Sequence, residues 1–180
     1  MKRVLFTALA LGLTLAGISL PAEEEPRRLD AELLWELDRL GAPAISPAGD
    51  LVVVPVTSYD VEKDESETRL WLLSAASGDL QRPLTVAGQS ASNPVFSPDG
   101  SQLAFVSSRG EDEAGQIYLL PMTGPGEAAR LTDVPTGVSA LKWVGDHLYF
   151  ISSVWPEKSF EQMAEALKAD KDAKVSARTW

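Results

Sequence analysis

The stretch PVFSPDGSQLAFVSS, residues 94–108, decides the fold. It opens with a short apolar segment, Pro94–Phe96, and turns at Ser97-Pro98-Asp99-Gly100. Proline fixes φ at the first central position of this turn, and Asp-Gly completes the reversal. Leu103–Val106 is then a continuous apolar run, as expected of a strand that is covered on both faces. The stretch therefore predicts two strands joined by a tight turn.

Working outward from this stretch, the same pattern recurs along the chain. Ser46-Pro47-Ala48-Gly49 lies 51 residues before the Ser-Pro-Asp-Gly turn. Further copies are Leu70–Leu73 with Ile117–Leu120, Pro83–Thr85 with Arg130–Thr132, and Leu103–Ser108 with Leu148–Ser153, the last copy opening at Leu141-Lys142-Trp143. A period of about 50 residues, made of short strands, is typical of propeller blades with four strands each.

We therefore predict an all-β chain that forms a partial β-propeller of about two and a half four-stranded antiparallel blades, preceded by a short helix and a signal peptide. Blade one is expected at 42–88, blade two at 91–136, and the start of blade three, with a helical insert, at 139–180. The expected strands are Ala44–Ile45, Leu51–Thr57, Leu70–Ser74, Val95–Phe96, Leu103–Ser107, Ile117–Pro121, Leu141–Trp143 and Leu148–Ser152, and the insert helix is expected near Ser159–Asp170.

The first 22 residues have the pattern of a secretory signal peptide. Lys2 and Arg3 are basic, residues 4–16 are almost wholly apolar, and Pro21-Ala22 precedes a run of glutamates. The apolar segment is shorter than the roughly 20 residues that span a bilayer. We expect cleavage after Ala22 and a periplasmic or extracellular destination; an uncleaved anchor is the alternative.

A helix is expected within the next segment, residues 23–41. Asp30 is a good N-cap, because its carboxylate can accept hydrogen bonds from free N–H groups of the first turn. Leu33, Leu37 and Leu40 share one helical face. Gly41 is expected to end the helix, and Trp35 is expected to pack against the domain that follows.

Composition restricts the function classes. The chain has a formal charge of -10 and a pI near 4.6. Such a chain is repelled by nucleic acids and anionic lipids, so we expect no nucleic-acid partner and, after signal cleavage, no membrane contact. The absence of cysteine excludes disulfides, thiolate metal sites and a cysteine nucleophile.

Candidate sites are few. His147 is the single histidine and lies at a strand-opening turn, where an exposed turn residue is the simplest interpretation. The acidic residues from Asp60 to Glu67 contain no glycine, which a calcium loop needs for its tight turn, so a solvated loop is expected. Residues 111–113 are interpreted in the same way. We assign no catalytic, cofactor-binding or metal-binding residue, and no cofactor.

The repeats resemble those of TolB-like propellers and of the prolyl oligopeptidase family of serine peptidases. Residues 33–47, Val56–Asp60 and Leu70–Leu72 resemble the opening of secreted dipeptidyl and acylaminoacyl peptidases of that family. The tail, with Ser153-Val154-Trp155-Pro156-Glu157, the helix and Lys174–Arg178, resembles their third-blade insert. The resemblance spans nearly all of the chain after residue 22.

This resemblance implies a propeller that restricts access of short peptides to a C-terminal α/β-hydrolase domain with a Ser-Asp-His triad. The sequence contains no G-x-S-x-G pentapeptide, which would hold the serine of that triad. We therefore interpret the chain as the propeller fragment of such a peptidase, inactive alone, with peptides and its own hydrolase domain as partners. The alternative is a non-enzymatic TolB-like periplasmic propeller that binds proteins.

Overall fold

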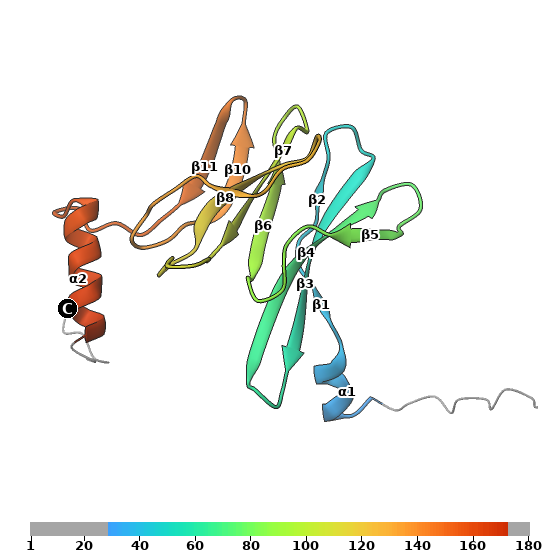
Figure 1. Ribbon diagram of the computed structural model, residues 1–180, viewed down its shortest axis with the longest axis horizontal. Helices are drawn as coiled ribbons and strands as arrows, with labels where there is room; N and C mark the ends of the chain where they lie inside the picture. Colours follow the sequence, from blue (N-terminus) through green and yellow to red (C-terminus); the bar gives the residue numbers. More distant parts are fainter. Residues whose placement is uncertain (1–28, 173–180) are drawn as a thin grey trace, which may run out of the picture.

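The structure is a computed structural model, which describes residues 29–172 (Figure 1). The predicted signal peptide and residues 173–180 lie outside the described residues. Within that range the elements in chain order are α1 (Ala31–Glu36), β1 (Arg39–Leu40), β2 (Ala44–Ile45), β3 (Leu51–Asp60), β4 (Glu65–Ser74), β5 (Leu80–Pro83), β6 (Ala91–Phe96), β7 (Gln102–Ser107), β8 (Gln116–Pro121), β9 (Ala129–Arg130), β10 (Ser139–Val144), β11 (His147–Ile151) and α2 (Phe160–Asp172).

The strands form two antiparallel meanders and the opening hairpin of a third. Blade one contains β2, β3, β4 and β5, with β1 pairing beside β2 on the same edge of β3; blade two has the order β6-β7-β8-β9. β10 and β11 form the third unit. All of these pairs are antiparallel. The predicted all-β propeller fold is confirmed, and each of the eight expected strands overlaps an observed one.

A serine hydroxyl closes the first turn of both complete blades. Ser46 Oγ and Ser97 Oγ each accept a hydrogen bond from the N–H five residues later, at 3.0 and 2.9 Å. The turn glycines, Gly49 and Gly100, have φ of 74° and 72°, a conformation that glycine adopts without steric cost. The repeated Ser-Pro-x-Gly motif is therefore turn chemistry, as the sequence predicted.

Blade two is buried on both of its faces. The interface with blade one includes Val53, Leu70 and Leu72 of blade one and Leu103, Phe105, Tyr118 and Leu120 of blade two. The opposite face packs on the third unit through Ala104, Val106 and Ile117, together with Val134, Val138 and Leu141. The alternation of side chains along β7 serves these two interfaces, which explains its continuous apolar run.

The outer faces of the first and third units are less well covered. Val54 and Trp71 of blade one are half-buried, whereas Tyr149 and Ile151 on β11 are 57% and 65% exposed. The four apolar side chains lie at the ends of the stack, where within residues 29–172 no further blade covers them.

The N-terminal helix is shorter than predicted. Asp30 does cap it, since its Oδ1 accepts from Leu33 N at 2.8 Å. Leu37, however, is already extended, with φ of -80° and ψ of 123°, so the prediction that the helix continues to Gly41 was wrong. Arg39 and Leu40 instead pair with Thr57 and Val56. A helix of this length has little stability of its own, and the free edge of β3 offers backbone hydrogen bonds.

The β3–β4 hairpin is longer than predicted and places most of the acidic segment in strands. β3 continues to Asp60 and β4 begins at Glu65, which leaves a turn of four residues. The hydroxyls of Thr57 and Thr68 bond across the hairpin at 2.8 Å. Threonine favours strands, and this cross-strand pair helps to extend the ladder.

Candidate functional site

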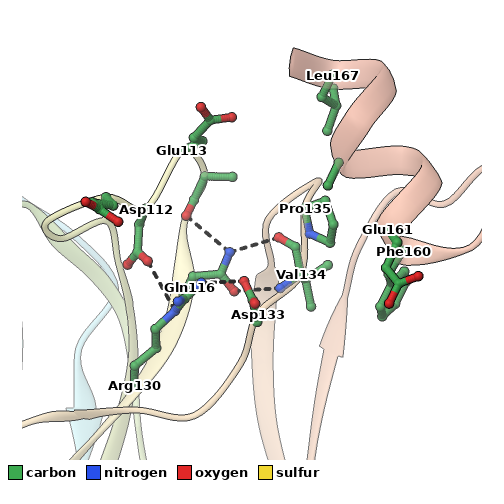
Figure 2. Close-up of a pocket in the computed structure, with 13 residues that line it drawn as sticks. Asp112, Glu113, Gln116, Arg130, Asp133, Val134, Pro135, Phe160, Glu161 and Leu167 are labelled. Atoms are coloured by element: carbon green, nitrogen blue, oxygen red, sulfur yellow. Dashed lines mark hydrogen bonds and ion pairs between the residues drawn. The ribbon is translucent and has the colours of Figure 1, made fainter. Parts of the chain in front are cut away.

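The candidate site is a cleft of about 380 Å³ between the β7–β8 loop of blade two and α2 (Figure 2). The blade side of the cleft carries polar groups, among them Asp112, Gln116 and Arg130. The helix side supplies Phe160, Glu161, Ala164 and Leu167. Segments more than 40 residues apart in the sequence thus line one cleft.

A reciprocal capping box fixes the start of α2. Gln162 N donates to Ser159 Oγ at 3.3 Å, and Ser159 N donates to Gln162 Oε1 at 3.0 Å. Met163 is 1% exposed, and its sulfur accepts a hydrogen bond from Trp155 N at 3.4 Å. The predicted insert helix is confirmed, and it turns Phe160 and Leu167 toward the cleft.

Asp112 organises the blade wall of the cleft. Its carboxylate accepts from the Tyr118 hydroxyl at 2.6 Å and from Arg109 N at 3.1 Å. Arg130 Nε lies 3.1 Å from the other carboxylate oxygen. The Asp112 side chain is only 4% exposed, so these donors replace water around a buried charge. The prediction that residues 111–113 form a solvated acidic loop was wrong for Asp112.

Burial and the hydrogen bond to Asp112 together raise the pKa of Tyr118, burial contributing more. The guanidinium of Arg109 lies over the Tyr118 ring, 4.6 Å from its centroid, and over the Phe105 ring at 5.2 Å. Tyr118 and Phe105 are themselves stacked, with centroids 6.1 Å apart. The network therefore joins the cleft to the interface between the blades.

Gln116 forms the floor of the cleft and is almost completely buried. Its Oε1 accepts from Val134 N at 3.0 Å and from the Thr132 hydroxyl at 2.9 Å. Its Nε2 donates to Val134 O at 2.8 Å. Because the side-chain amide is satisfied on both sides, Gln116 holds the 132–134 segment in place and has little capacity left for a ligand.

The chemistry of the cleft suits binding better than bond cleavage. Arg130 is engaged by Asp112 and also by Asp133, whose Oδ1 lies 2.6 Å from its Nη2. Glu111 and Glu161 add negative charge beside the apolar surface of Phe160. None of the described residues that line this cleft is a serine, threonine, cysteine or histidine, so they include no hydroxyl or thiol nucleophile paired with a histidine base.

The other residues considered in the sequence lie apart from the cleft. His147 is exposed at the start of β11, with its ring 6.3 Å from that of Tyr149, as expected of a turn residue. In the acidic hairpin Asp60 is paired with Lys63, which lowers its pKa. Trp35 packs edge-on against Tyr59 with centroids 5.5 Å apart, in agreement with the predicted packing role.

Two further findings apply to residues 29–172 alone. No group of three or more acidic or histidine side chains in this range is arranged to hold a metal ion. None of the described helices is both long enough and apolar enough to cross a bilayer.

Sequence comparison relates the chain to peptidases. It is 36% identical over 104 residues to an uncharacterized peptidase, YuxL, of Bacillus subtilis (strain 168), a match covering 58% of this chain and 15% of that protein. It is 24% identical over 115 residues to dipeptidyl-peptidase 5 of Porphyromonas endodontalis, covering 64% of this chain and 16% of that protein. The chain thus spans about a sixth of the length of these relatives. No protein-family model matches it.

Structural comparison supports the fold. The acylaminoacyl peptidase of Pyrococcus horikoshii matches with a TM-score of 0.54 and 19% identity, over 71% of this chain and 19% of that one. The β-propeller domain of the Trilobed protease from Pyrococcus furiosus matches with a TM-score of 0.47 and 18% identity, over 61% of this chain and 31% of that one. The resemblance to peptidases seen in the repeats is confirmed by the sequence relatives. The acylaminoacyl peptidase structure supports the fold and nothing beyond it.

Sequence reasoning did not find the Asp112 network. Its members are spread from Arg109 to Arg130, and only the fold brings them together. The sequence did contain one indication of the network. Arg130 stands where the first repeat has Pro83, so a cationic side chain replaces a residue that has no hydrogen-bond donor. A charged residue that enters an otherwise matching repeat indicates a local partner.

Proposed function

We propose that this chain is the N-terminal part of the β-propeller of a secreted serine peptidase that cleaves short peptides. The similarity to two proteins named as peptidases, over 58% and 64% of this chain, carries the proposal. The activity belongs to the whole protein, in which an α/β-hydrolase domain supplies the serine, histidine and aspartate of the triad.

In this proposal the blades control access and do not take part in bond cleavage. A propeller surrounds a central channel, and its width limits what reaches a domain placed over it. Blade two is rigidly held, because both faces are buried and Asp112, Gln116 and Ser97 satisfy its loops from within. A rigid channel wall selects peptides by size, and dipeptidyl and acylaminoacyl peptides are the substrate class that we propose.

The experiment uses the complete translation product of the gene. Blocked dipeptide and acyl-peptide chromogenic substrates are compared with a folded protein substrate. We expect hydrolysis of the short substrates, inactivation by a serine-directed fluorophosphonate, and no cleavage of the folded protein. His147→Ala should leave the rate unchanged, because His147 is exposed on a turn and the histidine of the triad comes from the hydrolase domain.

Two results would contradict the proposal. A product without a G-x-S-x-G elbow and without hydrolysis would favour the protein-binding, TolB-like scaffold. Loss of activity in the His147→Ala variant, with folding unchanged, would place the catalytic base in this chain.

We propose that the protein is exported to the periplasm, because the apolar N-terminal segment ends at Pro21-Ala22 and three glutamates follow it directly. After removal of Lys2 and Arg3 with the signal peptide, 14 basic residues remain against 26 acidic ones, a net charge of -12. In a Gram-negative host we expect soluble periplasmic protein that begins at Glu23, determined by N-terminal sequencing. Recovery of Met1 in the membrane fraction would contradict secretion.

A further inference from the structure

The inner strands of all three units contain a β-bulge at the same position. In blade two and in the third unit, two residues of the inner strand lie opposite one residue of its partner. The flanking pairs are Ser92–Val106 and Val95–Ala104 in blade two, and Ser139–Ile151 and Lys142–Tyr149 in the third unit. Each inner strand therefore has one extra residue, which bends it and increases its twist.

Blade one has the same irregularity in another form. Leu40 pairs with Val56 and Ala44 with Val53, so that three residues, Gly41 to Pro43, lie opposite two. The bulge is wide enough to divide the inner strand into β1 and β2. Its position one repeat before Asn93 shows that the irregularity belongs to the repeat itself.

The bulges of the later units require an unfavourable backbone conformation. Asn93 and Ala140 are 47 residues apart, and both have a φ of 51°. Asparagine tolerates this left-handed region, but for alanine it costs about 1 kcal/mol. A conformation that is kept in two repeats at such a cost indicates a function for the bulge.

The three bulges meet at one cavity of about 460 Å³, which we call the collar: residues 41–43, 92–95 and 140–141, with Pro55, Thr57 and Thr68. The inner strands β2 and β10 both contact β6, and Figure 1 shows β6 between them. None of the described residues that line the collar is ionisable. These lining residues therefore cannot form an ion pair with a ligand in the collar.

The polar groups of the collar are not all engaged. The hydroxyls of Thr57 and Thr68 bond to each other. The side chains of Ser92 and Asn93, in contrast, make no hydrogen bond with any other described residue, and Asn93 is exposed. Its amide offers both a donor and an acceptor at the wall of a neutral cavity.

We propose that the collar binds the uncharged main chain of an extended peptide, and that the Asn93 side chain hydrogen-bonds one of its peptide groups. An amide presents the same donor and acceptor as a peptide group, and Pro43, Pro55 and Pro94 provide rigid apolar walls. The choice of a peptide as ligand rests on the proposed function. The collar is then a specificity element of the channel, away from the reacting bond.

Glycine substitutions at two matched positions test the proposal. Asn93→Gly removes the amide and suits the positive φ, and Asp64→Gly relaxes a similar backbone geometry, with a φ of 53°, in a turn outside the collar. Binding of the blocked peptide acetyl-trialanine amide to the complete translation product is measured by calorimetry. Loss of one hydrogen bond should weaken binding about fivefold in Asn93→Gly, with Asp64→Gly unchanged. Circular dichroism checks the fold of each variant.

The outcomes separate this proposal from the peptidase function. Equal binding by wild type and Asn93→Gly, equal weakening in both variants, or a requirement for a charged peptide end would overturn the collar. Hydrolysis of chromogenic peptides is measured on the same preparations. Hydrolysis without Asn93-dependent binding would support the peptidase function and overturn the collar. Asn93-dependent binding without hydrolysis would support the collar and overturn the peptidase function.

Discussion

Blade one and blade two close their strands with the same hydrogen bonds but differ in how they are covered. Thr85 Oγ1 accepts from Leu70 N at 3.1 Å, and Thr132 Oγ1 accepts from Ile117 N at 2.9 Å, one repeat later. These bonds resemble those of the serine turns, which also match between the blades. Local hydroxyl groups therefore define the repeat, independently of what packs on either face.

The difference lies at one cross-strand pair. Val54 faces Trp71 in blade one, and Phe105 faces Tyr118 at the equivalent place in blade two. The first pair is half-buried at the end of the stack, whereas Phe105 is completely buried and Tyr118 is 6% exposed. The comparison teaches that the same strand position changes from surface to core when a neighbouring blade is added.

The largest expected effect tests this difference in burial. Phe105→Ala should lower the free energy of unfolding by about 3–5 kcal/mol, because it leaves a cavity among close-packed neighbours. Val54→Ala, on the uncovered face, should cost about 1 kcal/mol. Chemical denaturation of the 180-residue chain on its own measures both, because further blades of a longer protein would cover Val54. Similar losses at the two positions would show that blade one is covered as well as blade two.

The next effect concerns the charge that only blade two buries. Asp112→Ala leaves the Tyr118 hydroxyl, Arg109 N and the Arg130 guanidinium without their acceptor. We expect a loss of about 2–3 kcal/mol in the free energy of unfolding. The neighbouring exposed carboxylate provides the control, since Glu111→Ala should change stability by less than about 0.5 kcal/mol. A loss as small as that control would mean that solvent reaches Asp112.

A smaller effect appears at alkaline pH. The pKa of Tyr118 is raised, so its neutral form is favoured in the folded state. Its stabilising contribution is complete below the ordinary tyrosine pKa of about 10 and is lost as the pH rises through the folded value. Tyr118→Phe should remove this part of the alkaline stability loss, measured as midpoint against pH. Tyr149→Phe, at an exposed position, should retain it.

The smallest effect concerns the pKa of Asp99, a carboxyl group of the second serine turn that the first turn lacks because Ala48 stands in its place. Hydrogen bonds from the Ser97 hydroxyl, and then from the Ser101 N–H and hydroxyl, lower the pKa of Asp99 to about 2. Its contribution is therefore present above the ordinary aspartate value of about 3.9 and is lost as the pH falls toward 2. Nuclear magnetic resonance titration of the carboxyl carbon should give a midpoint near 2. A midpoint near 4 would mean that the turn hydrogen bonds are absent in solution.

The sequence predicted the elements whose signals are local. Turn residues such as Pro98 and Gly100 and apolar runs such as Leu103–Val106 located the first two strands of blade two, and Asp30 located the start of α1. β1 could not be predicted, because Arg39 and Leu40 become a strand only beside the free edge of β3. The outer strands β5 and β9 have four and two residues, too few to show an alternating pattern, and depend equally on a neighbour.

Most of the candidate site could not be predicted from the sequence. Asp112 resembles its exposed neighbours Glu111 and Glu113, and its burial depends on Tyr118 and Arg130 arriving from other strands. The collar was equally hidden, since a bulge is visible only when both strands of a pair are known. Both sites depend on pairings between segments far apart in the chain.

The serine turns differ by an exchange that leaves each of them complete. In blade one Ala48 stands where blade two has Asp99, and the Ser46 hydroxyl donates to Asp50 at 2.7 Å. In blade two the Ser97 hydroxyl donates to Asp99 at 2.6 Å. Every acceptor lies within a few residues of its serine, so each turn is complete in itself and needs no partner from the rest of its blade. Unequal recombination on either side of this five-residue motif would therefore add or delete a whole repeat in frame while each serine kept its own acceptor.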